Sequence, residues 1–232
     1  VELTADELAA IAAADILLLQ LEVPMATVIA AAEHAHANST TVVLNAAPFQ
    51  PLADGLLNVV DVLVVNEGEA AALGTQALES VEAVVTTLGG DGVRVVVGGE
   101  TTELPASKVI VADTTGAGDT FCGALCAALC EGRSLVDAAR FASIAAGISV
   151  QRPGAVSSIP TRKEIDEVTR DPLIPRPLDE PTVVDLDAPL ADIADTLDRA
   201  KIFVAPDDPG DWERWRQRLA DWRDDARARH GY

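Results

Sequence analysis

Residues 113–123 read Asp-Thr-Thr-Gly-Ala-Gly-Asp-Thr-Phe-Cys-Gly, and this stretch says most about fold and chemistry. The apolar residues 109–112 before it predict a short strand, and residues 120–130 after it predict an apolar helix. Gly116 and Gly118 permit a tight turn between the two. Because the first amides of a helix lack partners and lie at the positive end of its dipole, this turn is suited to bind an anion such as phosphate.

Asp119 stands at the start of the predicted helix, where a carboxylate would compete with a bound phosphate. Two roles are open from the residues alone. Asp119 either caps the helix or takes the proton of an incoming hydroxyl while nearby amides stabilise the transferred group.

The complete string resembles the second signature of the ribokinase-like (PfkB) carbohydrate kinases, and within them it is most similar to the ribokinases. Other segments resemble the family's landmarks in the same order, and these are residues 20–24, 44–48, 66–69, 87–92 and 152–158. The resemblance covers about residues 1–169. It implies transfer of a phosphoryl group from ATP to a sugar hydroxyl, with ribose giving ribose 5-phosphate.

The resemblance assigns catalytic roles within the opening stretch. It implies that Asp119 is the base, and that Gly116, Ala117 and Gly118 form the anion hole. It also implies that Glu22 contacts the sugar together with Asp119.

A nucleotide site is implied in the same way, with Mg²⁺ held through water by Glu69. The residues expected to contact ATP are Asn66, Thr87, Leu88, Gly89, Gly90, Asp91, Gly92, Gly118 and Ser143. Taken alone, Asn66 and Glu69 could instead cap a helix, and Gly-Gly-Asp-Gly at 89–92 is first of all a hairpin turn.

A monovalent-cation loop is the last implied site, with K⁺ as the expected ion. The residues matching it, several through carbonyl oxygens, are Asp113, Thr115, Ser149, Arg152, Gly154 and Ser158.

Apolar segments that end in polar residues alternate with helical segments along the chain. Strands are predicted at residues 16–20, 41–45, 62–66, 84–88 and 93–97, a helix at 24–37, and a capping box at Thr4 and Glu7. This alternation predicts an α/β fold with a doubly wound, mainly parallel sheet and helices on both faces. We therefore expect the functional residues at the carboxyl ends of the strands.

The predicted domain organisation has three parts. Residues 1–169 form a ribokinase-like kinase domain that lacks its N-terminal part, including the lid strands and a sugar-binding Gly-Gly motif. Between 74 and 84 the chain is shorter than the family pattern, which suggests a lost helix and an open flank of the nucleotide site. Residues 170–181, with four prolines, predict a linker. Residues 182–232 predict a small α/β extension, which we interpret as a truncated second module.

Within that extension, residues 210–229 predict a helix. An aromatic stripe at helical spacing, which favours packing on a core or partner over cofactor binding, comprises Trp212, Trp215, Leu219 and Trp222.

The composition limits the possible partners. The 232 residues carry a formal net charge of −20, which argues against nucleic-acid binding. No apolar run approaches the roughly eighteen residues of a membrane span, and the acidic start is unlike a signal peptide, so we expect a cytoplasmic protein. The expected partners are a small-molecule sugar and ATP, and in addition either a second copy in a homodimer or the missing N-terminal segment, supplied by the full-length protein.

Cys122, Cys126 and Cys130 recur at four-residue spacing on the predicted helix, which favours core packing over a metal site. Two further functions stay open. One is an inactive nucleotide-binding remnant or fusion arm, and the other is a nucleoside or fructose-phosphate kinase.

Overall fold

The computed structural model describes residues 2–170. The chain divides after Ile165 into two units, and all six strands belong to the first. The linker predicted at 170–181, the extension at 182–232 and its tryptophan stripe lie outside the described residues and stay predictions.

A six-stranded mixed sheet forms the centre of the first unit. Its strands follow one another in chain order, β1 to β6, with β1 to β4 parallel and β5 and β6 antiparallel. Their bounds are β1 Ile16–Leu19, β2 Thr41–Asn45, β3 Val62–Asn66, β4 Ala83–Thr87, β5 Val93–Val97 and β6 Glu100–Leu104. The expected α/β fold with a mainly parallel sheet is confirmed.

The strand predicted at residues 109–112 is wrong, because the structure has no strand there. The backbone amides of Ala112 and Asp113 instead donate to the carbonyl of Val150, at 2.7 and 3.1 Å. Ile110 and Val111 are 88% and 57% exposed. The apolar run therefore lies on the surface beside the C-terminal end of the helix at 135–149. The last strand of the sheet is β6.

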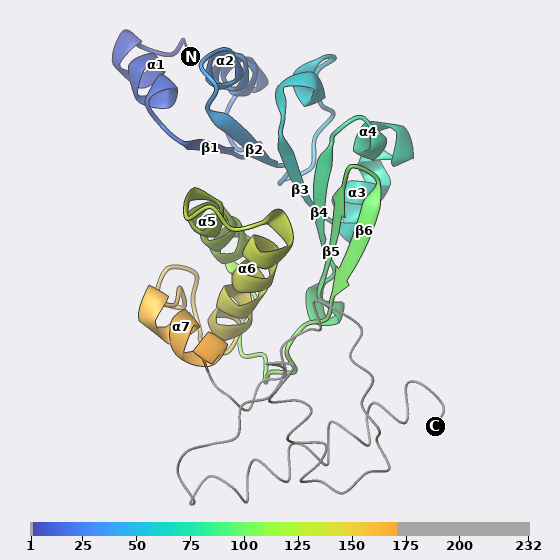
Figure 1. Cartoon of the computed structure of the whole chain (residues 1–232), viewed down its shortest axis with the longest axis vertical. Helices are drawn as coiled ribbons and strands as arrows, with labels where there is room; N and C mark the ends of the chain where they lie inside the picture. The colour runs from blue at the N-terminus through green and yellow to red at the C-terminus, as the bar shows by residue number, and fades with distance from the viewer. Residues whose placement is uncertain (1, 171–232) are drawn as a thin grey trace, which may run out of the picture. The chain divides into compact units, whose positions relative to one another are not determined.

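Helices cover both faces of the sheet (Figure 1). One face packs against α5 Ala117–Cys130 and α6 Leu135–Ser149, and the other against α1 Ala5–Ala12, α2 Met25–Ala37, the short η1 Leu56–Val59, α3 Glu67–Leu73 and α4 Thr75–Glu79. The remaining elements are η2 Gly89–Asp91 and α7 Arg162–Arg170.

Each central strand feeds both cores, because successive side chains point to opposite faces. In β3, Val62 and Val64 join the core under α5 and α6, whereas Leu63 and Val65 join the core under α2 and α3. Parallel strands buried on both faces read as continuous apolar runs, which explains why β2 and β3 were predicted with their observed bounds.

Two local predictions at helix starts can be compared directly. The capping box at Thr4 is confirmed, with the amide of Glu7 donating to Thr4 Oγ1 at 3.3 Å and the amide of Thr4 donating to Glu7 Oε2 at 2.6 Å. The helix predicted at 24–37 begins one residue later, with Pro24 as the N-cap of α2. The segment after Gly74, where a helix was expected to be lost, forms the short helix α4.

Candidate active site

The turn at Gly116 begins α5 and shapes the predicted anion hole. Gly116 has a φ of 75°, a left-handed conformation that favours glycine, and it occupies the N-cap position. The first intrahelical bond runs from the amide of Thr120 to the carbonyl of Gly116 at 2.9 Å. The amides of Gly118 and Asp119 precede that bond, whereas the amide of Ala117 donates to the carbonyl of Thr114 at 3.2 Å. A Cβ added at Gly118 would meet open space.

Asp119 does not cap α5. Its Oδ1 accepts a hydrogen bond of 2.7 Å from Gln20 Nε2, which comes from the residue directly after β1. A cavity of about 340 Å³ lies over this pair and is lined by Leu18, Gln20, Asp119 and Cys122. The structure thus places the carboxylate at the wall of a cavity and at the start of a helix.

Cys122 lies in the same wall, and its thiol has two carboxylates near it. Burial raises the pKa of the Cys122 thiol to about 12, with smaller contributions from Cys126, Asp119 and Glu69. The thiol therefore remains protonated and acts as a small apolar group in the cavity wall beside the predicted base.

The loop around Asp113 is bound to the loop that follows α6. Asp113 Oδ1 accepts from the amide and the hydroxyl of Thr115 at 2.9 and 2.7 Å, and its Oδ2 accepts from the amide of Gly154 at 2.9 Å. The Thr115 hydroxyl and amide and then the Gly154 amide hold the pKa of Asp113 at about 2. The carboxylate therefore stays ionised and joins two segments that the cation-loop prediction had grouped.

Buried hydroxyl groups connect this loop to α5. Ser149 and Ser158 lie 2.9 Å apart through their Oγ atoms, and the Thr120 hydroxyl is 3.4 Å from that of Ser149. The Ser158 hydroxyl donates to the carbonyl of Ala155 at 2.8 Å. A Cβ added at Gly116 would lie 3.1 Å from the Cβ of Ala155, so the turn and the loop are in close contact.

Arg152 differs from the other residues of the predicted cation set. Its guanidinium pairs with Glu164 at the start of α7, and this bond is the main reason why the pKa of Glu164 is lowered to about 2. The amide and hydroxyl of Thr161 also donate to Glu164. The Arg152 side chain thus anchors the loop to α7, which leaves its backbone carbonyl as the group that could face a cation.

Asn66 and Glu69 form a capping box at the start of α3. Asn66 Oδ1 accepts from the amide of Glu69, and Glu69 Oε2 accepts from the amide of Asn66, both at 2.8 Å. This is the structural alternative that the sequence left open. Glu69 is buried, and the register of the sheet sets Asn66 beside Thr87.

The glycine-rich segment after β4 is a hairpin connection, as its spacing predicted. The amide of Leu88 donates to the carbonyl of Gly92 at 2.8 Å, across the turn η2. Gly92 has a φ of 109°, and a Cβ there would lie 2.0 Å from the carbonyl oxygen of Leu104. Glycine is therefore required at 92 by the fold, whereas Gly89 and Gly90 are exposed with open space around them.

Glu22 and Ser143 complete the predicted site residues. Glu22 is exposed in the loop that carries Gln20, and Ser143 is half-buried on α6. No catalytic or binding role was predicted for Gln20, because its contact with Asp119 depends on the proximity of β1 to α5 in the fold.

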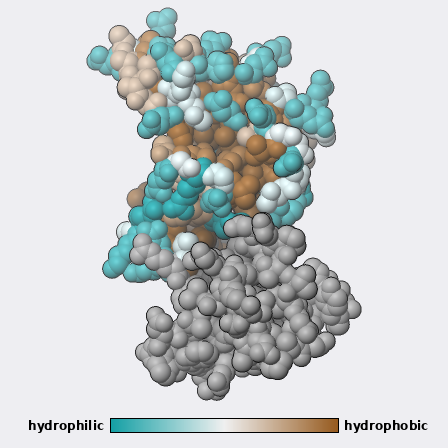
Figure 2. Space-filling view, viewed as in Figure 1, coloured by the Kyte–Doolittle hydropathy of each residue, from teal (hydrophilic) through white to brown (hydrophobic). Residues whose placement is uncertain are grey.

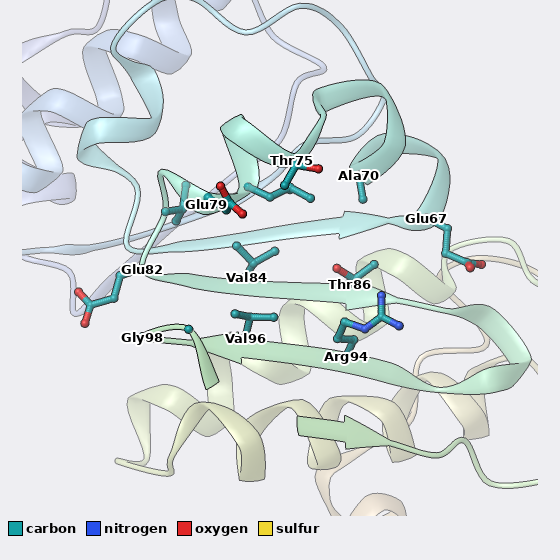
Figure 3. Close-up of a pocket in the computed structure, with 13 residues that line it drawn as sticks. Glu67, Ala70, Thr75, Glu79, Glu82, Val84, Thr86, Arg94, Val96 and Gly98 are labelled. Carbon is teal, nitrogen blue, oxygen red and sulfur yellow. The ribbon is translucent and has the colours of Figure 1, made fainter. Parts of the chain in front are cut away.

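A second groove, of about 570 Å³, lies on the other face of the sheet. It runs between the α3–α4 segment and strands β4 and β5, with Val84 and Val96 at its floor and Glu67, Glu79 and Glu82 among its lining residues (Figure 3).

Hydrophobic side chains gather in the middle of the face shown in Figure 2, where the strands meet α5 and α6. Across residues 2–170, no helix is long and apolar enough to span a membrane. The same residues contain no group of three or more His, Cys, Asp or Glu side chains arranged to hold a metal ion.

Comparison with known proteins places these features in a family context. A model of the family described as "pfkB family carbohydrate kinase" matches residues 2–162. The ribokinase of Haemophilus influenzae is 43% identical over 171 residues, which cover 67% of this chain and 56% of the relative. The ribokinase of Schizosaccharomyces pombe is 38% identical over 175 residues, covering 67% of this chain and 55% of the relative. The chain thus spans about half the length of these curated relatives.

Solved structures that resemble this chain also include ribokinases. The ribokinase of Thermotoga maritima has a TM-score of 0.67 and 35% identity, with 71% of this chain and 60% of that chain covered. A ribokinase of Arabidopsis thaliana complexed with ribose and ATP has a TM-score of 0.68 and 32% identity, with 72% and 60% covered.

Proposed function

Because the chain belongs to the pfkB family of carbohydrate kinases, we propose that it forms the phosphoryl-transfer part of an ATP-dependent sugar kinase that converts ribose to ribose 5-phosphate. The carrying observation is the placement of Asp119, whose carboxylate lines a cavity and lies one turn from the left-handed Gly116. Ribose is favoured as acceptor because the relatives named above are ribokinases, one of them solved with ribose and ATP.

In the proposed reaction, the sugar hydroxyl enters the cavity beside Asp119, and Glu22 contacts the sugar. Asp119 takes the hydroxyl proton as the oxygen forms a bond to the γ-phosphorus, and the bond to the bridging oxygen of ADP breaks. The amides of Gly118 and Asp119 stabilise the negative charge on the transferred group, and Gly116 and Ala117 shape the turn that presents them. Protein catalysis is then mainly positioning and charge stabilisation.

The proposed nucleotide site follows the carboxyl ends of the strands. Asn66 and Thr87 are neighbours in the register of β3 and β4, and the segment from Leu88 to Gly92 continues directly from β4. Ser143 is proposed to lie beside the adenine of ATP. Ligands of doubly wound sheets bind at this edge, which supports the assignment.

The residues present fit a hydrated Mg²⁺ better than a protein-caged one. Glu69 is a single buried carboxylate with one oxygen engaged by the amide of Asn66, and Mg²⁺ in kinase sites keeps several waters and binds phosphate oxygens. When bound, the ion neutralises phosphate charge. Glu69 would hold it through water.

The loop around Asp113 and the loop that follows α6 present oxygen atoms, and such a donor set fits a monovalent cation such as K⁺. The ionised Asp113 carboxylate, the hydroxyls of Ser149 and Ser158, and the carbonyls around Arg152 and Gly154 would hold it, with Thr115 orienting Asp113. When bound, the ion adds positive charge beside the proposed anion hole at Gly116. Contact between Gly116 and Ala155 connects this loop to the turn.

A noncatalytic nucleotide-binding arm is the second candidate. It is favoured by the fact that Asn66, Glu69 and Gly92 already have structural roles that need no catalysis.

One experiment separates the candidates. Phosphate transfer from ATP is followed with ribose, fructose 6-phosphate and a nucleoside, in K⁺ and in Na⁺, for the chain and for Asp119→Asn. Turnover with ribose that depends on Asp119 supports the kinase. ATP binding without turnover on any acceptor supports the arm, and preference for another acceptor reassigns the substrate.

A further inference from the structure

Gln20 contacts the proposed base directly, although 99 residues separate the two in sequence. We propose that Gln20 is a positioning residue, which orients the Asp119 carboxylate for proton transfer. This inference rests on the proposed function of Asp119 as base.

The backbone on both sides of Gln20 is fixed by the fold. Leu19 pairs with Leu44 in the parallel ladder of β1 and β2. Leu21 is buried, its amide donates to the carbonyl of Ala47 at 2.9 Å, and its carbonyl accepts from Gln50 Nε2 at 2.8 Å. The Gln20 side chain therefore starts from a backbone that is held before and after it.

The chemistry of the pair determines which atoms are used. An ionised carboxylate can only accept hydrogen bonds, so the Gln20 amide nitrogen is the donor. The 2.7 Å bond engages Asp119 Oδ1, which leaves Oδ2 as the oxygen available to a substrate hydroxyl. Glutamine is also neutral and does not release a proton near pH 7, so it holds the carboxylate without neutralising it.

The position of Asp119 gives this bond a specific purpose. The Asp119 side chain is exposed at the cavity wall, where packing alone does not restrict its rotation. A general base must come within about 2.6–3.2 Å of the proton that it takes. Misplacement of a reacting group by about 1 Å can reduce the rate about 100-fold.

The test compares Gln20→Met and Gln20→Glu with the unaltered full chain. Both replacements are close to glutamine in size, but neither has the amide donor, and glutamate adds a like charge beside Asp119. We expect kcat with ribose to fall about 10- to 100-fold in Gln20→Met, the range typical of lost supporting contacts, and further in Gln20→Glu. The KM for ATP should change less than about twofold, because Gln20 contacts the acceptor side of the site.

The matched control is Gln76→Met, at an exposed glutamine of α4, which should leave kcat unchanged. A Gln20→Met variant with unchanged or raised kcat would overturn the inference. A purely structural role would instead lower the thermal midpoint of Gln20→Met and leave kcat per folded molecule unchanged, which would also overturn it.

Asp119→Asn separates this inference from the proposed function. If Asp119→Asn keeps full turnover, the proposed base is wrong whatever Gln20 does. If Asp119→Asn is inactive and Gln20→Met is fully active, the base stands and the positioning role fails.

A second readout decides the matter if the chain shows no turnover. The side-chain amide resonances of Gln20 are followed by ¹⁵N NMR in the unaltered chain and in Asp119→Ala. We expect them to differ, because Asp119→Ala removes the oxygen that accepts the 2.7 Å bond. Resonances that are the same in both proteins would contradict the inference.

Discussion

Gly118→Ala is expected to raise the stability of the chain while weakening its interaction with ATP phosphates. A Cβ at this position meets no protein atom within 4 Å, and Gly118 lies inside the first turn of α5. Alanine in a helix is favoured over glycine by about 0.5–1 kcal/mol. For a chain of this size, that gain corresponds to a rise of about 1–4 °C in the thermal midpoint.

The loss of function follows from the same open space. If the phosphoryl group occupies the region next to Gly118, a methyl group there displaces the phosphate from the amides of the turn. Loss of one such donor typically lowers kcat about 100- to 1000-fold. We therefore expect kcat with ribose to fall at least about 100-fold and the Kd for ATP to rise.

The assays are thermal unfolding, calorimetry with ATP, and phosphate transfer to ribose. Gly123→Ala is the matched control, because Gly123 lies on the same helix, is exposed, and also has open space where an added methyl group would lie. It should give a similar gain in stability with unchanged ATP binding and kcat. If Gly118→Ala behaves like Gly123→Ala in both functional assays, the anion hole is not at this turn.

Three further predictions concern the structure around the site. Gly92→Ala should lower the free energy of unfolding by more than about 3 kcal/mol, because its Cβ would overlap the carbonyl of Leu104 at a left-handed φ; an unchanged urea midpoint would refute this. The pKa of Asp113 is lowered from 3.8 to about 2, so its carboxylate adds stability that is complete above pH 4 and is lost as the pH falls toward 2. Asp113→Asn should flatten this pH dependence of the unfolding free energy in urea titrations between pH 6 and 2.5. The same pH dependence in both proteins would count against it. Iodoacetamide at pH 8 should label the exposed Cys130 well before Cys122, because Cys122 is buried and its pKa is raised to about 12. Peptide mass spectrometry measures the order of labelling, and early labelling of Cys122 would disagree with the structure.

The central strands could be predicted from sequence because they are apolar runs with polar ends. Thr41–Asn45 and Val62–Asn66 are buried on both faces of the sheet, and this produces an unbroken hydrophobic signal. Composition alone gives no such signal for β6, which reads Glu-Thr-Thr-Glu-Leu and buries only Leu104. The apolar residues 109–112 gave a false signal, since a hydrophobic run indicates a strand only when the fold buries it.

The site was predictable where its parts are adjacent in sequence. The turn at Gly116 and the capping pair Asn66 and Glu69 follow from local spacing, whereas α5 begins at Ala117, ahead of the start predicted at 120. Contacts between distant segments could not be derived in this way. The bond from Gln20 to Asp119 and the anchoring of Arg152 by Glu164 depend on how separate elements of the chain meet, which spacing does not encode.

Phosphate transfer from γ-labelled ATP to ribose, compared between the chain and Asp119→Asn, tests the proposed base most directly. We expect ribose 5-phosphate from the unaltered chain and a rate lowered by about 100- to 10,000-fold in Asp119→Asn, the range for loss of a general base. Calorimetry should show that Asp119→Asn still binds ATP. Equal rates in the two proteins would show that Asp119 is not the base.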